Sequence, residues 1–285
     1  MIERSLIQNI CDNVERGGSR PLRQLNKIRS HLRTPLYRNG YALLVTAVTT
    51  SLLGIVFWAA AVRFYTAEVV GFSSATISAM VLVTGLASFS LQGVLVRFLP
   101  AAGGKAARLI LLAYAIHASM ALLLGTVFVH TITLWAPNLS ALSADGAAGW
   151  GFVLGTMVWS VFNLQDGALT GLRHAVWVPI ENILYAVGKM ALLVLLASGM
   201  PHWGIFAAWV LPAAAAILPI NLLLLGQLAP QAAKVHSPQV RATDRASILS
   251  YIIRNYPGAL FSLALSALMP WNMRSMAASS QQSMR

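Results

Sequence analysis

Charged side chains are scarce in this chain of 285 residues, and acidic ones are scarcer still. Asp, Glu, Lys and Arg together make up 10% of the sequence, only eight residues are acidic, and apolar residues make up 57%. Soluble globular domains carry about 25% charged residues. These shortages argue against an ordinary soluble protein and indicate a chain that lies largely in a lipid bilayer.

Cysteines and enzyme motifs are also nearly absent. The single cysteine, Cys11, excludes a disulfide within the chain. The sequence contains no HExxH, no GxSxG and no glycine-rich phosphate loop followed by Lys. His117 and His130 have no Cys, Asp or Glu at ligand spacing, so no metal site is predicted. We therefore expect a protein that is not an enzyme and that needs no cofactor.

Seven long apolar stretches organise the rest of the sequence. Each has about 19 to 25 residues, enough to cross a hydrocarbon core of about 30 Å as a helix. The stretches cover residues 39–62, 76–98, 109–135, 148–171, 180–200, 204–228 and 250–271. The sequence thus predicts an all-α, polytopic membrane protein with about seven transmembrane helices.

Basic residues are distributed unevenly around these stretches. When the gaps are assigned to alternate sides of a membrane, sixteen of the twenty Lys and Arg residues fall on one side and three on the other, with Lys189 inside a stretch. Cytoplasmic loops of membrane proteins carry an excess of Lys and Arg. We therefore predict a multi-pass protein of the inner or plasma membrane with a cytoplasmic N-terminus. The net charge of +12 then reflects topology and contact with the lipid bilayer, and not nucleic-acid binding.

The stretches divide the chain into five parts. Residues 1–38 form a basic segment with apolar residues at four-residue spacing, which indicates an amphipathic helix on the membrane surface; a partly disordered basic tail is the alternative. The six stretches within 39–228 predict a transmembrane bundle. A cytoplasmic connector at 229–249, a seventh transmembrane helix at 250–271 and a polar tail at 272–285 are predicted to follow.

Ionisable side chains inside the stretches are the candidate functional residues, because burying them in hydrocarbon costs free energy. Asp166 and Arg173 are seven residues apart, so a continuous helix would hold them on one face. Lys189 lies about 12 Å of helix beyond Glu181, too deep for its amine to reach the membrane surface. A buried lysine needs a carboxylate or a wet cavity, and we predict that Asp166 or Glu181 pairs with it. Lys189 then either lines a cavity or forms a structural ion pair.

Two further arginines end apolar stretches on opposite sides of the membrane. Arg63 follows the first stretch and Arg97 lies at the end of the second. Each either anchors its helix end among lipid head groups or contributes to a substrate site. The GxxxG pair Gly167 and Gly171 predicts close packing of one helix against another.

Three segments together resemble one family of membrane proteins. Residues 61–71 (AVRFYTAEVVG) resemble the turn, with its Glu and Gly, of polysaccharide biosynthesis proteins, and residues 91–100 (LQGVLVRFLP) resemble their helix-ending Arg-Phe-x-Pro stretch. Residues 165–182 (QDGALTGLRHAVWVPIEN) are similar to the hinge between their fourth and fifth spans. The resemblance covers residues 35–265 and is to the oligosaccharide flippase branch of the multidrug, oligosaccharidyl-lipid and polysaccharide exporters.

This resemblance implies two six-helix bundles that face each other across a V-shaped cavity. By alternating access, such proteins move a lipid-linked oligosaccharide from the inner to the outer leaflet, with a basic cavity around the pyrophosphate. It implies a polysaccharide polymerase or glycosyltransferases as further partners. Arg63 and Arg97 lie in the matching segments, and the other candidates rest on burial and position. The candidate cavity residues are Arg63, Arg97, Asp166, Arg173, Glu181 and Lys189.

The chain departs from the family pattern after the seventh stretch. A family member continues with a second bundle, whereas residues 271–285 are polar. We therefore expect a truncated or frameshifted copy that cannot complete a transport cycle unless two copies associate. Three functions stay open: flipping of a lipid-linked oligosaccharide, cation-coupled export of drugs or other small molecules within the same superfamily, and a non-transporting scaffold for polysaccharide assembly. An acidic residue deep in the first stretch would favour the second function, and the sequence has none there.

Overall fold

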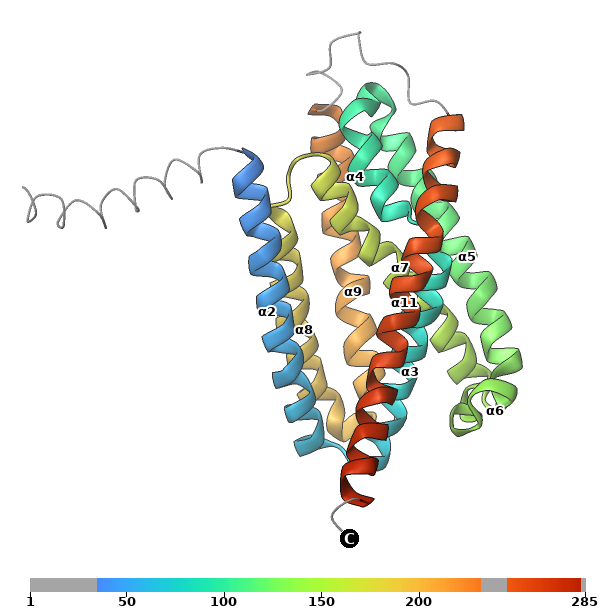
Figure 1. Cartoon of the computed structure of the whole chain (residues 1–285). Helices are drawn as coiled ribbons and strands as arrows, with labels where there is room; N and C mark the ends of the chain where they lie inside the picture. Colours follow the sequence, from blue (N-terminus) through green and yellow to red (C-terminus); the bar gives the residue numbers. More distant parts are fainter. Residues whose placement is uncertain (1–34, 232–244, 283–285) are drawn as a thin grey trace, which may run out of the picture.

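The structure is a computed structural model that describes residues 35–231 and 245–282. Every regular element in these two ranges is a helix, which confirms the predicted all-α fold (Figure 1). The elements are α2 (Pro35–Phe64), α3 (Ala67–Ala87), α4 (Leu91–Ala102), η1 (Gly103–Lys105), α5 (Ala106–Trp135), η2 (Pro137–Leu139), α6 (Ala141–Ala144), α7 (Gly146–Gly171), α8 (Trp177–Gly199), α9 (Gly204–Leu223), the π-helical η3 (Leu224–Leu228) and α11 (Arg245–Gln282).

Six helical segments of the described chain are long and apolar enough to cross a membrane. They are Thr46–Phe64, Ala67–Ala87, Leu91–Leu134, Gly146–Gly171, Trp177–Gly199 and Gly204–Gln231. The first, third, fourth, fifth and sixth predicted stretches each correspond to one of these segments. The chain is therefore a multi-pass α-helical membrane protein by the length and composition of its helices.

The seventh predicted stretch, 250–271, is helical but is not among these six segments. It lies within α11, where Arg254 and Asn255 interrupt the apolar residues. The described chain thus has six candidate spans instead of the predicted seven.

The boundaries of the predicted bundle move slightly at both ends. The first helix already begins at Pro35, inside the predicted basic segment, and the sixth span continues to Gln231, inside the predicted connector. The rest of both predictions, residues 1–34 and 232–244, lies outside the described residues.

The second predicted stretch, 76–98, is wrong as a single helix, because the chain turns in its middle. The helix α3 begins at Ala67 and ends at Ala87, and α4 begins only at Leu91. Phe89 and Ser90 between them have φ angles of 44° and 56°. Left-handed backbone at two successive residues other than glycine ends the ladder of helical hydrogen bonds. Hydrophobicity alone therefore predicts one helix over residues 76–98, although the backbone forms two.

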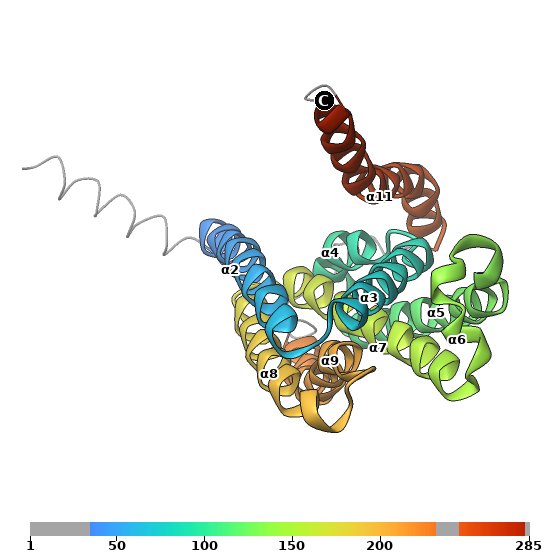
Figure 2. The same cartoon turned by 90° about the horizontal axis from the view of Figure 1, so that it is seen from below.

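The helix α11 covers this break from outside. The Tyr256 hydroxyl donates a hydrogen bond of 2.6 Å to the carbonyl of Leu86, which has no helical partner beyond the end of α3. The rings of Tyr256 and Phe89 also pack together, with centroids 4.9 Å apart. Figures 1 and 2 both show α11 beside α3 and α4 at the edge of the bundle. Tyr256 thus provides a hydrogen-bond donor for the Leu86 carbonyl and a packing partner for the Phe89 ring.

The helices α7 and α4 approach each other closely at two glycines of α7. A Cβ on Gly167 would lie 3.3 Å from the Cα of Gln92, and one on Gly171 would lie 2.5 Å from the carbonyl oxygen of Leu95. Only glycine permits such an approach, so the packing role predicted for this GxxxG pair is confirmed. The contact fixes the end of α7 that carries Asp166.

Successive spans run in opposite directions, so their connections gather at two ends of the bundle (Figure 1). Arg97, Lys105 and Arg108 lie around the junction of α4 and α5, and Arg173 lies at the α7–α8 turn on the same end. Arg63 lies at the opposite end, where α2 stops. Basic residues of the described spans therefore concentrate at one end, called the basic end below. That this end is cytoplasmic stays a prediction.

Single cysteines test which end faces the cytoplasm. In a chain with Cys11 replaced by Ser, Gly104→Cys and Ser140→Cys probe the two ends at exposed positions. If the basic end faces the cytoplasm as predicted, a membrane-impermeant maleimide added to intact cells should label S140C, and should reach G104C only after permeabilisation. Labelling of G104C but not S140C in intact cells would reverse the orientation.

Candidate functional site

The predicted site residues fall into separate groups instead of one cavity. Arg63 and Arg97 are exposed at opposite ends of the bundle, so the structure does not bring them together. The Arg97 guanidinium lies 5.4 Å from the ring centroid of Tyr251 on α11 and 5.7 Å from that of Phe98. Arg97 therefore contributes to holding α11 against α4 by cation–π attraction.

Arg173 does not share a helix face with Asp166, contrary to the prediction. The helix α7 ends at Gly171, and Arg173 follows it with a left-handed φ of 65°. Its backbone N–H donates to the carbonyl of Thr170, and the next N–H, of His174, donates to that of Leu169. These bonds close the end of α7 and turn the chain into α8. The continuous helix assumed from the sequence stops before it reaches Arg173.

Lys189 is buried, with 5% of its side chain exposed, but it is not paired with a carboxylate as predicted. Glu181 lies eight residues earlier on α8, about 12 Å along the helix axis. Asp166 lies on α7, where its hydrogen-bond donor is Asn182. Within the described chain neither carboxylate is in ion-pair contact with Lys189.

Three aromatic rings surround the Lys189 ammonium instead. Its Nζ atom lies 3.8 Å from the ring centroid of Trp209 on α9, 4.6 Å from that of Phe57 on α2 and 5.1 Å from that of Tyr185 on α8. Each ring face attracts a cation, by about 2 kcal/mol when the pair is shielded from water. We call Lys189 and these rings the aromatic cage. It joins α2, α8 and α9, which lie side by side in Figures 1 and 2.

A second polar group lies between the cage and the basic end, and we call it the acidic cluster. It consists of Tyr114 on α5, Asp166 on α7, and Glu181 and Asn182 on α8. The Asn182 amide donates to Asp166 at 3.2 Å and to the carbonyl of Val178 at 3.0 Å. The Tyr114 hydroxyl and the Glu181 carboxyl both lie within electrostatic range of Asp166. The cluster thus brings together the two predicted acidic residues and two neutral polar groups.

Glu181 is the most isolated member of the acidic cluster. Only 2% of its side chain is exposed, and neither carboxyl oxygen has a hydrogen-bond partner among the described residues. The buried Tyr114 hydroxyl also lacks a partner in this part of the chain. Such groups are costly in a hydrocarbon environment, and they are typical of sites that bind an ion or a substrate.

An apolar groove between α8 and α9 leads to Glu181. Its volume is about 840 Å³, and it is lined by Glu181, Tyr185, Trp177 and aliphatic or small residues that include Leu184, Leu211, Pro212 and Pro219. Leu184 and Leu211 are exposed on the outer surface of the bundle, so the groove faces lipid in a membrane. Pro212 and Pro219 remove backbone donors from α9, which carries the π-helical turn η3 at its end.

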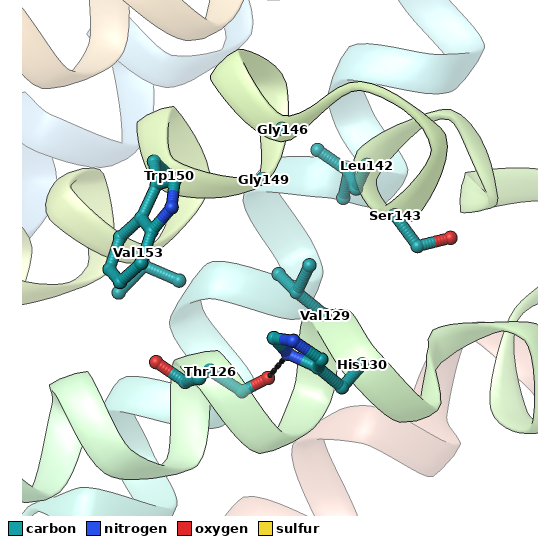
Figure 3. Close-up of a pocket in the computed structure, with 9 residues that line it drawn as sticks. All are labelled: Thr126, Val129, His130, Leu142, Ser143, Gly146, Gly149, Trp150 and Val153. Carbon is teal, nitrogen blue, oxygen red and sulfur yellow. Dashed lines mark hydrogen bonds between the residues drawn. The ribbon is translucent and has the colours of Figure 1, made fainter.

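A separate hollow lies at the opposite end, between α5, α6 and α7 (Figure 3). Its volume is about 170 Å³, and His130, Ser143 and Trp150 contribute to its walls. The His130 ring forms a hydrogen bond of 2.9 Å with the carbonyl of Thr126, one turn earlier on its own helix. None of the predicted site residues lines this hollow.

Asp166, Glu181 and Lys189 lie within the bundle as the sequence indicated, whereas the three predicted arginines are exposed, and the surroundings of the buried groups were not predicted. Tyr185 stands four residues from both Glu181 and Lys189, so helical spacing carries a signal for it. Phe57, Trp209 and Tyr114 belong to other helices, and spacing along the chain carries no signal for contacts of that kind.

The fold and its polar core define an α-helical, multi-pass membrane protein with ionisable groups buried inside the bundle. Comparison of the chain with models of protein families, with curated proteins and with solved structures gave no match. Within the described residues, no group of three or more His, Cys, Asp or Glu side chains is arranged to hold a metal ion.

The aromatic cage makes a quantitative prediction for Lys189→Met. A buried ion pair that loses one partner costs about 3–5 kcal/mol. Removing the caged cation leaves no carboxylate unpaired in the described chain, and the recovered desolvation cost of the ammonium offsets the lost ring contacts, so the net cost should be about 2 kcal/mol or less. Thermal unfolding in detergent should therefore show K189M close to wild type, with exposed Lys105→Met as the matched control. Trp209→Ala should cost more, about 3–5 kcal/mol, because it empties a volume shared by three helices. A larger loss for K189M than for W209A would contradict the cage.

Proposed function

We propose that this protein moves a lipid-linked oligosaccharide from the cytoplasmic to the outer leaflet of a cell membrane, for polysaccharide assembly. The observation that carries the proposal is the buried Lys189, whose ammonium has aromatic rings and no carboxylate around it in the described chain. A lysine that only stabilised the bundle would be expected beside a counter-ion. Its charge remains available for an anionic ligand.

A pyrophosphate-linked substrate fits such a charge. Attraction between two opposite charges grows several-fold when water is replaced by a medium of lower dielectric constant. An ammonium that leaves an aromatic ring for a phosphate exchanges a contact of about 2 kcal/mol for a charge-assisted hydrogen bond. The rings of the aromatic cage would therefore hold the Lys189 ammonium in place when no anion is bound.

The basic end supports the first step of the same process. Arg97, Lys105, Arg108 and Arg173 lie at one end of the bundle, and Arg245 begins α11. Positive charges near a membrane surface attract anionic head groups, each contributing about 1 kcal/mol. A substrate presented at this end would meet a local excess of positive charge before it meets Lys189.

Cation-coupled export of a drug or another small molecule is a second candidate. The acidic cluster favours it, because Asp166 and Glu181 are both carboxylates within the bundle and have no ion-pair partner among the described residues. Buried carboxylates of this kind are typical of proton relays and ion sites in transporters.

Vesicles that contain the purified chain test the proposal. A fluorescent polyprenyl-pyrophosphate-linked saccharide is placed in the inner leaflet of the vesicles. An impermeant enzyme that modifies the saccharide then measures how much of it reaches the outer leaflet. With several copies in each vesicle, so that two chains can associate, we expect wild type and Lys105→Met to flip the saccharide faster than empty vesicles do. Lys189→Met should be slower by about tenfold, the factor that corresponds to 1.4 kcal/mol of lost interaction.

Two results of this experiment would contradict the proposal. Flipping no faster than in empty vesicles would reject translocation, and a fluorescent organic cation expelled by the same vesicles would then favour the second candidate. Absence of both activities, with the fold intact, would favour a non-transporting scaffold. Equal rates for K189M and wild type would remove Lys189 from the substrate path.

A further inference from the structure

Glu181 combines three properties that no other carboxyl of the described spans combines. It is 98% buried, since 2% of the side chain is exposed. Both of its oxygens lack hydrogen-bond partners in the described chain. It also lines the apolar groove between α8 and α9, so it is buried within the bundle but borders a space that opens toward lipid.

An ionised Glu181 has little to stabilise it in this position. Transfer of an unpaired carboxylate out of water costs so much free energy that the neutral, protonated form becomes the stable one. The nearest alternative, an ion pair, would need a cation. Lys189, on the same helix, is held by the aromatic cage about 12 Å away along the axis.

Among the described side chains of α2, α7 and α9, the helices packed on α8, no cation is in contact with Glu181. Asp166 on α7 and Tyr114 on α5 face Glu181, and both add negative or neutral groups. The packed helix α9 contains no titratable residue from Gly204 to Leu223. On α2 the titratable residues with described side chains are Tyr41 and Arg63; Tyr41 is exposed, and Arg63 lies at the far end of the bundle.

Asp166 differs from Glu181 in a way that decides which carboxyl takes a proton. The Asn182 amide donates a hydrogen bond to Asp166, and this side chain is only partly buried. Both features make ionisation less costly for Asp166 than for Glu181. Two negative charges at close range disfavour each other, so an ionised Asp166 further favours the neutral form of Glu181.

We propose that Glu181 is a proton-binding site within the membrane, which Asp166 and Asn182 keep in its protonated form and which the α8–α9 groove connects to the lipid phase. The proton adds to one carboxyl oxygen of Glu181, and it leaves to water when that water or a conformational change reaches the acidic cluster. The inference goes beyond the proposed translocation, because it assigns a ligand to residues which that activity does not require. Its test needs no transported substrate.

The hydrophobic reagent dicyclohexylcarbodiimide reads out this site in the unmodified protein. The reagent dissolves in lipid and reacts with protonated carboxyls, and peptide mass spectrometry locates the adduct. We expect an adduct on Glu181 that is lost in Glu181→Gln. Above the titration midpoint the adduct should fall about tenfold for each pH unit, in proportion to the protonated fraction.

Glu68 provides a matched control within the same molecule, because it is exposed in the first turn of α3. A water-soluble carbodiimide should modify Glu68 and spare Glu181, and the lipid-soluble reagent should show the opposite preference. Protection of Glu181 by added Na⁺ at constant ionic strength would overturn the proposal in favour of a metal-cation site.

Infrared difference spectroscopy gives a second readout that does not depend on access through the groove. The spectrum of wild type minus Glu181→Gln should contain the C=O stretching band of a protonated carboxyl at neutral pH. A band without an adduct would reject the groove as the route to Glu181. The absence of both band and adduct would overturn the proposal.

Discussion

A lysine ammonium buried among apolar helices must find a partner, and in this bundle the partner is a set of aromatic rings. Phe57, Tyr185 and Trp209 come from three different helices and converge on one Nζ atom. Three helices, α2, α8 and α9, therefore meet around a single charge. Phe57 and Trp209 also pack edge to face, 5.3 Å apart, which holds two of the rings in position when the cation moves.

The cage also separates positive from negative charge within the bundle. Lys189 and Glu181 lie on one helix, with the Tyr185 ring between them along the axis. An ion pair would have neutralised both groups and fixed them together. Their separation leaves a cation among rings and a carboxyl beside an apolar groove, so each keeps its own chemistry. Movement of an anion requires an available cation, and proton binding requires an available carboxyl group. The separation of Lys189 from Glu181 leaves both groups available in one bundle.

Features that depend on one segment of the chain could be predicted from the sequence. Contacts between residues far apart in the sequence could not. Hydropathy and length fixed five of the spans, because crossing a membrane depends on the composition of each segment alone. The turn at Phe89 and Ser90 was missed, since an apolar run carries no sign of a broken backbone. The ion pair predicted for Lys189 was wrong because the sequence shows which groups need a partner but not which distant side chain supplies one. The sequence thus indicated Asp166, Glu181 and Lys189, but it did not indicate their neighbours, and it wrongly added three exposed arginines.

Proton resonances of Lys189 test the cage most directly. Only four lysines occur in the chain, so a sample with isotope-labelled lysine in lipid nanodiscs gives a simple spectrum, assigned with Lys189→Met. Protons above an aromatic ring are shifted upfield by its ring current. The account predicts that the Hε signals of Lys189 lie upfield of those of exposed Lys105, and that Trp209→Ala moves them back toward the Lys105 position. Equal chemical shifts for Lys189 and Lys105 in the wild-type protein would contradict it.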